Sequence, residues 1–273
     1  MTAAPAPVTA STAPSLGRRL GWNLRDTWLV TWRNLLFFAR NPYWIMLAVV
    51  QPIMFTLLFV FVFGGAISGL PPGVSYKDYA LPGIIIQTVV FSSLGSGINL
   101  AEDLQKGMMD RFRSLPIGRG VVLTARTLSD LVRNFGGAVI MAGVGFAVGY
   151  RFHGPWLDGL LALAIALAFG YAFSWIATTI GLMTRNPQTA EIAGFTWAFP
   201  VVFASSIFVP VQTMPGWLRA FAKVNPVTLA ADATRHLSLH QPVGNDAWWT
   251  LAWCLGIVVV FRTLAVWQFR RLS

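Results

Sequence analysis

The chain has 273 residues, of which 55% are hydrophobic and only 11% are charged, and its mean hydropathy is +0.61. A soluble domain carries about a quarter charged residues, so this composition excludes an ordinary soluble protein and indicates a chain that lies almost entirely in a membrane. The net charge of +10 is compatible with nucleic acid binding or with basic loops held on one side of a membrane.

The N-terminal part of the chain divides into two segments. Residues 1–17 are mostly small and proline-rich, and we expect a disordered tail there, followed by a single transmembrane domain over residues 18–273. Within residues 18–40, four apolar residues recur at helical spacing, namely Leu24, Trp28, Trp32 and Leu35. This pattern predicts an amphipathic helix in the plane of the membrane interface, although the same residues also fit the polar first turns of a span.

Six apolar stretches approach the length of a transmembrane helix, which needs about 20 mostly apolar residues. In chain order they are residues 44–63, 83–100, 131–150, 156–179, 192–211 and 248–269. The segment between the fifth and sixth is too short and too polar to cross twice, and Asn225-Pro226 divides it into two short helices. We expect these to dip partway into the membrane, shielded from lipid by protein. The sequence therefore predicts an all-α integral membrane protein with six transmembrane helices, an N-terminal interfacial amphipathic helix and short external re-entrant helices before the last span.

The basic residues are distributed unevenly between the predicted loops. With the N-terminus inside, 15 of the 20 Lys and Arg residues fall in cytoplasmic segments and 5 in external ones. This is the positive-inside pattern, so the net charge reports topology and the nucleic acid interpretation falls away. An even number of spans places both termini in the cytoplasm.

The connection between the second and third spans is the charge-densest part of the chain. Acidic and basic side chains alternate there at Glu102, Asp103, Lys106, Asp110, Arg111 and Arg113. An apolar side is supplied by Leu104, Met108, Met109, Phe112 and Leu115, and Pro116 and Gly118 end the helix. Paired acids and bases favour a protein partner over a membrane surface, which attracts mainly basic residues.

Several functional classes lack their expected residues. No G-x-x-x-x-G-K-[ST] phosphate loop occurs, so we expect any ATP to be bound by a partner. All ten acidic residues fall in loops or near predicted span ends, which argues against coupling to a proton or sodium gradient. His153, His236 and His240 show no metal-ligand spacing. Three serines, Ser92, Ser93 and Ser96, have no base within a span, so helix packing is favoured over intramembrane catalysis. We expect no metal and no catalytic residue.

Aromatic and small side chains in the second and fifth spans provide a candidate path for a flat or greasy solute. The residues are Phe91, Ser92, Phe195, Trp197, Phe199 and Phe203. Each of the aromatic residues also fits a core or lipid-facing position.

Several short motifs, in this order, resemble type-2 ABC export permeases of the daunorubicin-resistance (DrrB-like) class. The run DLQKGMMDRFRSLPI at residues 103–117 resembles the loop between the second and third spans of that class. Matching motifs elsewhere are Gln51-Pro52-Ile53-Met54-Phe55, Leu81-Pro82-Gly83-Ile84, Asn186-Pro187-Gln188-Thr189, Met214-Pro215-Gly216-Trp217 and Asn225-Pro226-Val227-Thr228. The resemblance covers roughly residues 25–270.

The resemblance implies an assembly in the bacterial plasma membrane. Two copies of the permease, forming a homodimer, or two related permeases would sit on two separate ATPase subunits that hold ATP and Mg. The assembly would export a hydrophobic compound such as an antibiotic or a lipid. The residues implied to contact the ATPase are Glu102, Asp103, Lys106, Gly107, Asp110, Arg111, Phe112, Arg113, Leu115 and Pro116. An exporter of lipid-linked polysaccharide and an ATP-independent secondary transporter are the alternatives.

Overall fold

The computed structural model describes residues 42–107 and 119–271, and this part contains helices and no strand. The elements in chain order are α2 (Pro42–Leu57), the π-helix η1 (Leu58–Phe63), α3 (Tyr76–Gln105), α5 (Arg119–Val148), α6 (Trp156–Thr184), α7 (Pro187–Phe203), the 3-10 helix η2 (Val211–Thr213), α8 (Gly216–Val224), α9 (Pro226–Ser238) and α10 (Asp246–Arg271). The predicted all-α class is confirmed for these residues. The tail and the interfacial helix predicted before residue 41 lie outside them.

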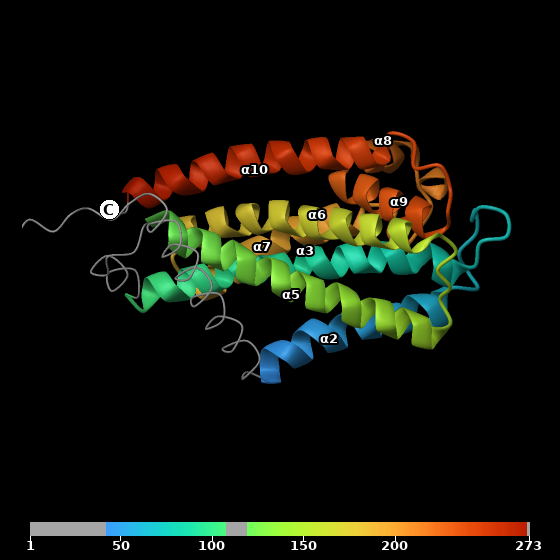
Figure 1. Ribbon diagram of the computed structural model, residues 1–273, viewed down its shortest axis with the longest axis horizontal. Coiled ribbons are helices and arrows are strands. Elements are labelled where there is room, and N and C mark those ends of the chain that lie inside the picture. Colours follow the sequence, from blue (N-terminus) through green and yellow to red (C-terminus); the bar gives the residue numbers. More distant parts are fainter. Residues whose placement is uncertain (1–41, 108–118, 272–273) are drawn as a thin grey trace, which may run out of the picture.

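Four helices are long and apolar enough to cross a membrane, and they lie side by side along the long axis of the molecule (Figure 1). They are α3, the Ser129–Val148 part of α5, α6 and the Asp246–Phe269 part of α10. They correspond to the second, third, fourth and sixth predicted spans. The first and fifth predicted spans do not meet the same length criterion among the described residues, since α7 has 17 residues and the apolar stretch Val50–Phe63 is also short.

Helix α7 differs from the predicted fifth span at both ends. It begins at Pro187 rather than at residue 192, because Asn186 caps it with its side-chain oxygen and proline suits the first helical position. It ends at Phe203, three residues after Pro200, which lies inside the helix and has no N–H to donate to the carbonyl of Thr196. The Asn225 side chain then donates to two carbonyls at the end of α7, at 2.7 and 3.2 Å, so the chain can leave the helix there.

Helix α3 is the central element of the bundle. In its most apolar stretch 72% of the residues are buried, against 22% in α5 and in α10. It packs closely against α6, where Gly97 and Gly181 face each other and a Cβ on either glycine would clash with backbone of the other helix. Small residues at such crossings let two membrane helices approach until their backbones touch.

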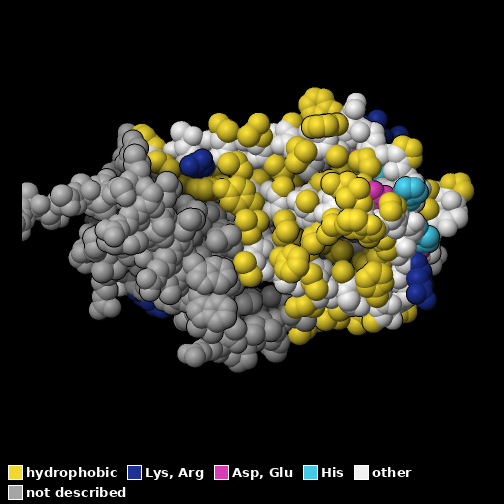
Figure 2. Space-filling model, in the orientation of Figure 1, with side chains coloured by type: hydrophobic (Ala, Val, Ile, Leu, Met, Phe, Trp, Pro, Cys, Tyr) yellow, Lys and Arg dark blue, Asp and Glu magenta, His cyan; other side chains and the backbone are white. Residues whose placement is uncertain are grey.

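The two ends of the bundle differ in what they carry. Helices α8 and α9 and the connection between η1 and α3 lie at one end, which we call the α8–α9 end, and the last turn of α10 lies at the other, the C-terminal end (Figure 1). In the space-filling view most of the charged and histidine side chains that are visible gather at the α8–α9 end, while the middle is predominantly hydrophobic (Figure 2). This distribution is that of a protein whose waist contacts lipid.

Candidate functional site

The predicted ATPase-contacting segment begins in the last turn of α3. The helix ends at Gln105 because Gly107 adopts a positive φ of 64°, which glycine accepts without steric cost. Glu102 and Asp103 are therefore part of α3, and the single helix expected from Glu102 to Pro116 is wrong at this point. The remaining predicted residues here, Asp110, Arg111, Phe112, Arg113, Leu115 and Pro116, lie outside the described residues.

One ion pair is formed at this exposed end of α3. The Lys106 Nζ atom lies 2.5 Å from Glu102 Oε1, one helical turn away. The hydrogen bond to the Glu102 carboxylate raises the pKa of Lys106. Because both side chains are exposed to solvent, the pair stabilises the fold little. Its two charges remain accessible to a partner.

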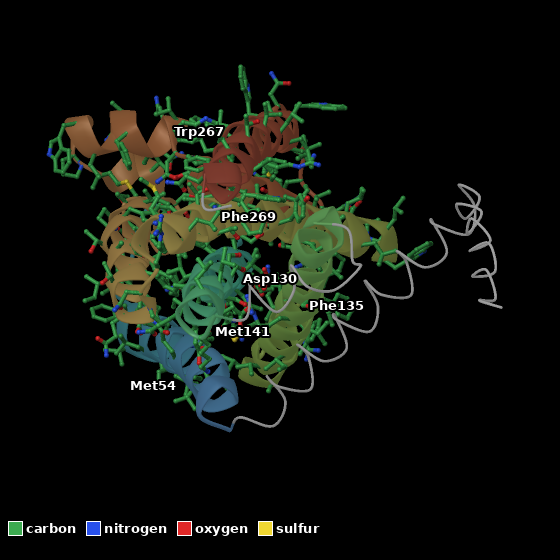
Figure 3. All side chains as sticks on the ribbon, turned by 90° about the vertical axis from the view of Figure 1, so that its left-hand side faces the viewer. Met54, Asp130, Phe135, Met141, Trp267 and Phe269 are labelled. Atoms are coloured by element: carbon green, nitrogen blue, oxygen red, sulfur yellow. The ribbon has the colours of Figure 1, made fainter. Side chains whose placement is uncertain are left out.

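A buried polar cluster joins α3 to α5 deeper in the bundle. Ser96 Oγ donates a hydrogen bond to the Asp130 carboxylate, and Asp130 Oδ1 lies 2.9 Å from Arg133 Nη2. Arg133 in turn donates to the Ser92 carbonyl at 2.8 Å and to the Ser92 hydroxyl at 3.2 Å. Figure 3 shows Asp130 and Met141 in the interior, whereas Phe135 and Met54 lie at the periphery. We call Ser92, Ser96, Asp130 and Arg133 the polar clasp.

The clasp corrects one prediction made from the sequence. The Asp130 and Arg133 side chains are only 5% and 12% exposed. Asp130 lies at the start of the apolar part of α5, near a span end as predicted, although the helix itself extends back to Arg119. Ser96 does have a carboxylate within reach, contrary to expectation. The signal available in the sequence was the Asp-x-x-Arg spacing, which puts both charges on one helix face opposite serines spaced four apart. Asp130 and Arg133 are both on α5 and balance each other's charge, and their hydrogen bonds to Ser92 and Ser96 join α5 to α3.

The α3–α5 contact keeps one register along its length. Arg133 meets Ser92, and a Cβ placed on Gly145 would overlap the Leu81 side chain. Helix α5 therefore runs antiparallel to α3 as a packed unit.

Four of the six predicted path residues come together. The ring centroid of Phe91 lies 5.8 Å from that of Phe195 and 5.2 Å from that of Phe199. The ring centroid of Phe203 lies 5.4 Å from that of Phe199. The spacing of four residues places the three α7 rings on one face of the helix. Helix α2, η1 and the turn after α7 continue the row with Phe55, Phe59, Phe63 and Phe208. We call these eight rings the aromatic strip.

The other two predicted path residues lie elsewhere. Ser92 belongs to the polar clasp on the α5 side of α3. Trp197 points toward α6, where its ring lies 5.6 Å from that of Phe173. Residues that are close in the sequence of a helix can point to different faces, and composition alone does not show which face each residue is on. Phe199 and Phe203 are each 39% exposed, so the aromatic strip lies partly on the surface of the chain.

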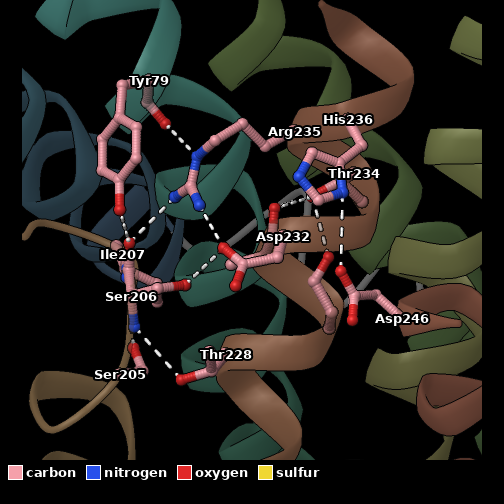
Figure 4. Close-up of polar contacts among 12 residues, drawn as sticks. Tyr79, Ser205, Ser206, Ile207, Thr228, Asp232, Thr234, Arg235, His236 and Asp246 are labelled. Atoms are coloured by element: carbon pink, nitrogen blue, oxygen red, sulfur yellow. Dashed lines mark hydrogen bonds and ion pairs between the residues drawn. The ribbon is translucent and has the colours of Figure 1, made fainter. Parts of the chain in front are cut away.

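A second polar network fixes α9 against α3 at the α8–α9 end (Figure 4). The buried Arg235 donates to the Tyr79 carbonyl at 2.8 Å, to the Ser206 carbonyl at 2.9 Å and to the Asp232 carboxylate, and its guanidinium lies over the Tyr79 ring. Ser206 Oγ donates to Asp232 at 2.7 Å. The two short helices predicted around Asn225-Pro226 are confirmed as α8 and α9, and this network holds α9 in place.

This network forms the floor of a cavity of about 610 Å³. The walls come from the connection before α3, from η2, α8 and α9, and from the start of α10. The volume is in the range of a small-molecule site. Two histidines lie in this region next to carboxylates: His236 Nδ1 is 3.5 Å from Asp246 and His240 Nδ1 is 2.9 Å from Asp158.

The fold is that of an integral membrane protein, and the family comparison gives its class. The ABC-2 type transporter family matches residues 25–239, and the chain belongs to this family. That range includes the polar clasp, the aromatic strip and both short helices.

Individual relatives extend this result. The daunorubicin resistance ABC transporter permease protein DrrB1 of Streptomyces coeruleorubidus is 32% identical over 88% of this chain and 84% of its own length. The probable doxorubicin resistance permease DrrC of Mycobacterium tuberculosis is 27% identical over 91% of this chain and 89% of its own. The probable multidrug permease YbhR of Escherichia coli is 21% identical over 73% of this chain and 54% of its own.

Proposed function

We propose that the chain is the permease subunit of an ATP-driven exporter that moves a hydrophobic compound, an antibiotic or a lipid, out across the plasma membrane. The membership of the ABC-2 family and the drug-resistance names of its relatives support this function. The observation that carries the export path is the aromatic strip, because a continuous row of phenylalanine rings offers flat apolar contacts to a flat apolar solute.

The proposed topology has six crossings, with α2 and η1 as the first and α7 as the fifth. The α8–α9 end faces outward and both termini are cytoplasmic. The excess of basic residues in the cytoplasmic segments supports this orientation. The short helices α8 and α9 sit at the exit as re-entrant elements, where protein shields their ends from lipid.

A second copy of the chain completes the path. Phe63, Phe199 and Phe203 are partly exposed in one chain, and two copies that meet along α7 would place two aromatic strips face to face. Aromatic residues are typical of buried interfaces between chains. A homodimer would therefore enclose an apolar path, which a single chain leaves open on one side.

The ATPase is a separate subunit that binds ATP and Mg and contacts Glu102, Asp103 and the residues that follow. The charged last turn of α3 supports this assignment, since its Glu102 and Lys106 side chains are exposed and of opposite sign. Movement at this end acts on α3 and α5 together, because the polar clasp ties the two helices.

The test is reconstitution with the cognate ATPase in vesicles. We expect the permease to stimulate ATP hydrolysis and an apolar fluorescent drug to leave the membrane only with hydrolysis. Export that continues with a hydrolysis-dead ATPase would overturn the proposal. A glycolipid retained by the purified complex would instead favour an exporter of lipid-linked polysaccharide.

The secondary transporter has one observation in its favour, the carboxylate of Asp130 inside the bundle. The Asp130 carboxylate already interacts with Arg133 and Ser96. These contacts stabilise its charge, which argues against a role as a proton carrier. Export driven by a proton gradient without ATP, and lost in Asp130→Asn, would establish that alternative.

A further inference from the structure

We propose that the cavity at the α8–α9 end is a binding site for a phosphate diester with a hydroxyl-bearing headgroup, supplied by a membrane lipid of the phosphatidylglycerol type. Two cationic side chains of α8 and a set of hydrogen-bond acceptors on α9 and α10 line the same 610 Å³ space. The proposal concerns binding and is independent of transport.

The cationic wall consists of Arg219 and Lys223, one helical turn apart on α8. Arg219 Nη2 donates to the carbonyls of Gln212 and Met214 at 2.5 and 3.0 Å, which fixes the guanidinium in place. Its Nε and Nη1 donate to nothing within the described residues, and Lys223 makes no hydrogen bond or ion pair among them. A fixed guanidinium beside an unpaired ammonium is the arrangement that binds a phosphate group.

The opposite wall is built to accept hydrogen bonds. Asp232 uses its Oδ1 atom for Ser206 and Arg235, so Oδ2 is left for a ligand in the described structure. Asp246 lies across from His236, whose buried Nδ1 atom has no hydrogen-bond partner among the described residues. A ligand with hydroxyl groups next to its phosphate satisfies both walls, since the phosphate accepts from α8 and the hydroxyls donate to these carboxylates.

The position of the cavity indicates that the ligand is a lipid. Exposed tryptophans surround this end of the bundle, with Trp156 and Trp217 each 76% exposed and Trp248 73% exposed. Such tryptophans mark the headgroup level of a membrane. Trp217, Phe221 and Val224 form an exposed apolar row along α8, which is how a helix lies in the interface plane. The cavity therefore opens where lipid headgroups are found.

The charge balance favours an anionic ligand over a cationic one. Three cationic lining residues, Arg219, Lys223 and Arg235, face two acidic ones, Asp232 and Asp246. Arg235 is already balanced by Asp232. The two cations of α8 then share the lining with one remaining carboxylate, that of Asp246, so the cavity keeps a net positive charge that disfavours an amine-bearing compound.

The experiment measures lipids retained by the purified full chain in nanodiscs. Native mass spectrometry would count phosphatidylglycerol, phosphatidylcholine and phosphatidylethanol, which has the same charge as phosphatidylglycerol but no headgroup hydroxyl. We expect one tightly held phosphatidylglycerol per chain and at least roughly tenfold weaker retention of the other two. The double variant Arg219→Gln/Lys223→Gln should lose this preference.

The matched control is Lys77→Gln/Arg151→Gln, which removes the same two residue types at the same end but outside the cavity lining. Equal loss in the control, or full retention in the α8 variant, would overturn the site. Equal retention of phosphatidylethanol would overturn the role of the acceptor wall. Titration with free glycerol phosphate distinguishes a lipid headgroup from a soluble phosphate as the ligand. We expect free glycerol phosphate to displace the lipid only at high concentration. Tight binding of glycerol phosphate with no lipid retained would overturn the lipid assignment and leave a soluble phosphate as the occupant.

Discussion

Gly97 of α3 and Gly181 of α6 face each other so closely that neither position has room for a Cβ. A Cβ on Gly97 would clash with the Ala177 carbonyl, and one on Gly181 with the Gly97 carbonyl. The obstacles are backbone atoms, which cannot rotate away as a side chain does. The approach of the two most extensively buried spans therefore depends on these two glycines.

Replacing either of these glycines by alanine should force α3 and α6 apart. We expect Gly97→Ala and Gly181→Ala each to destabilise the fold by about 2–4 kcal/mol, the range for overpacking against fixed atoms. Thermal unfolding in detergent would measure this. Gly143→Ala and Gly256→Ala are the controls, because nothing lies within 4 Å of a Cβ at either position. Unfolding temperatures that are the same in both sets would contradict the close crossing.

Removing the acid of the polar clasp should leave a buried cation without its nearest counter-charge. We expect Asp130→Ala to cost about 3 kcal/mol of stability, and Asp130→Asn less, because the amide oxygen still accepts from Ser96. Thermal unfolding compares both with Asp158→Ala, whose partner His240 is exposed, so that loss should be small. The prediction fails if the Asp130 and Asp158 variants unfold at the same temperature.

The Arg235 network should require the planar guanidinium. Arg235 donates to two carbonyls and one carboxylate at once, and a lysine ammonium cannot reach all three in that geometry. We expect Arg235→Lys to cost about 2–4 kcal/mol and to loosen α9, measured as faster hydrogen exchange in Pro226–Ser238. Arg151→Lys, at an exposed position of the same end, should change neither quantity. Unchanged exchange in the Arg235 variant would show that the network does not hold α9.

Much of this architecture follows from the sequence, for physical reasons that also explain the differences. Long uncharged runs locate α3, α6 and α10, and Asn225-Pro226 separates α8 from α9, because proline and its preceding cap end one helix and begin the next. The sequence placed Asp130 near the start of the third span, as the structure does, but a hydropathy average does not reveal the partners of a charge. The pairing that makes this charge tolerable depends on residues of α3.

The candidate path also depends on contacts between helices that the sequence does not reveal. Three α7 phenylalanines four residues apart share a face of the helix, as their spacing in the sequence implies, and the structure places the predicted Phe91 of α3 against them. Trp197 falls between them in the chain and points to α6 instead. Phe55, Phe59 and Phe208 join the strip through tertiary contacts, and nothing in their spacing relates them to α7.

Substitutions in the segment that follows α3 should separate coupling from folding. We expect Asp103→Ala and Arg111→Ala to lower export severalfold while membrane insertion is retained, because charged contacts to the ATPase are lost without disturbing the core. Export and ATPase association would be measured together in vesicles. Lys77→Ala, at the opposite end of α3, is the control. Normal export with normal ATPase association in both variants would refute the role proposed for this segment.

The aromatic strip and the buried core should respond differently to the loss of a ring. Phe199 is 39% exposed, so Phe199→Ala should cost less than about 1.5 kcal/mol of stability, whereas Phe169→Ala removes a fully buried ring and should cost about 3–5 kcal/mol. Export should show the reverse order among folded variants, since only Phe199 lies on the proposed path. We expect Phe199→Ala to lower the initial rate of dye export severalfold. Phe135→Ala, an exposed ring on α5 away from the strip, should leave both quantities near wild type. Export that is unchanged in Phe199→Ala while the dimer is intact would place the path elsewhere in the bundle.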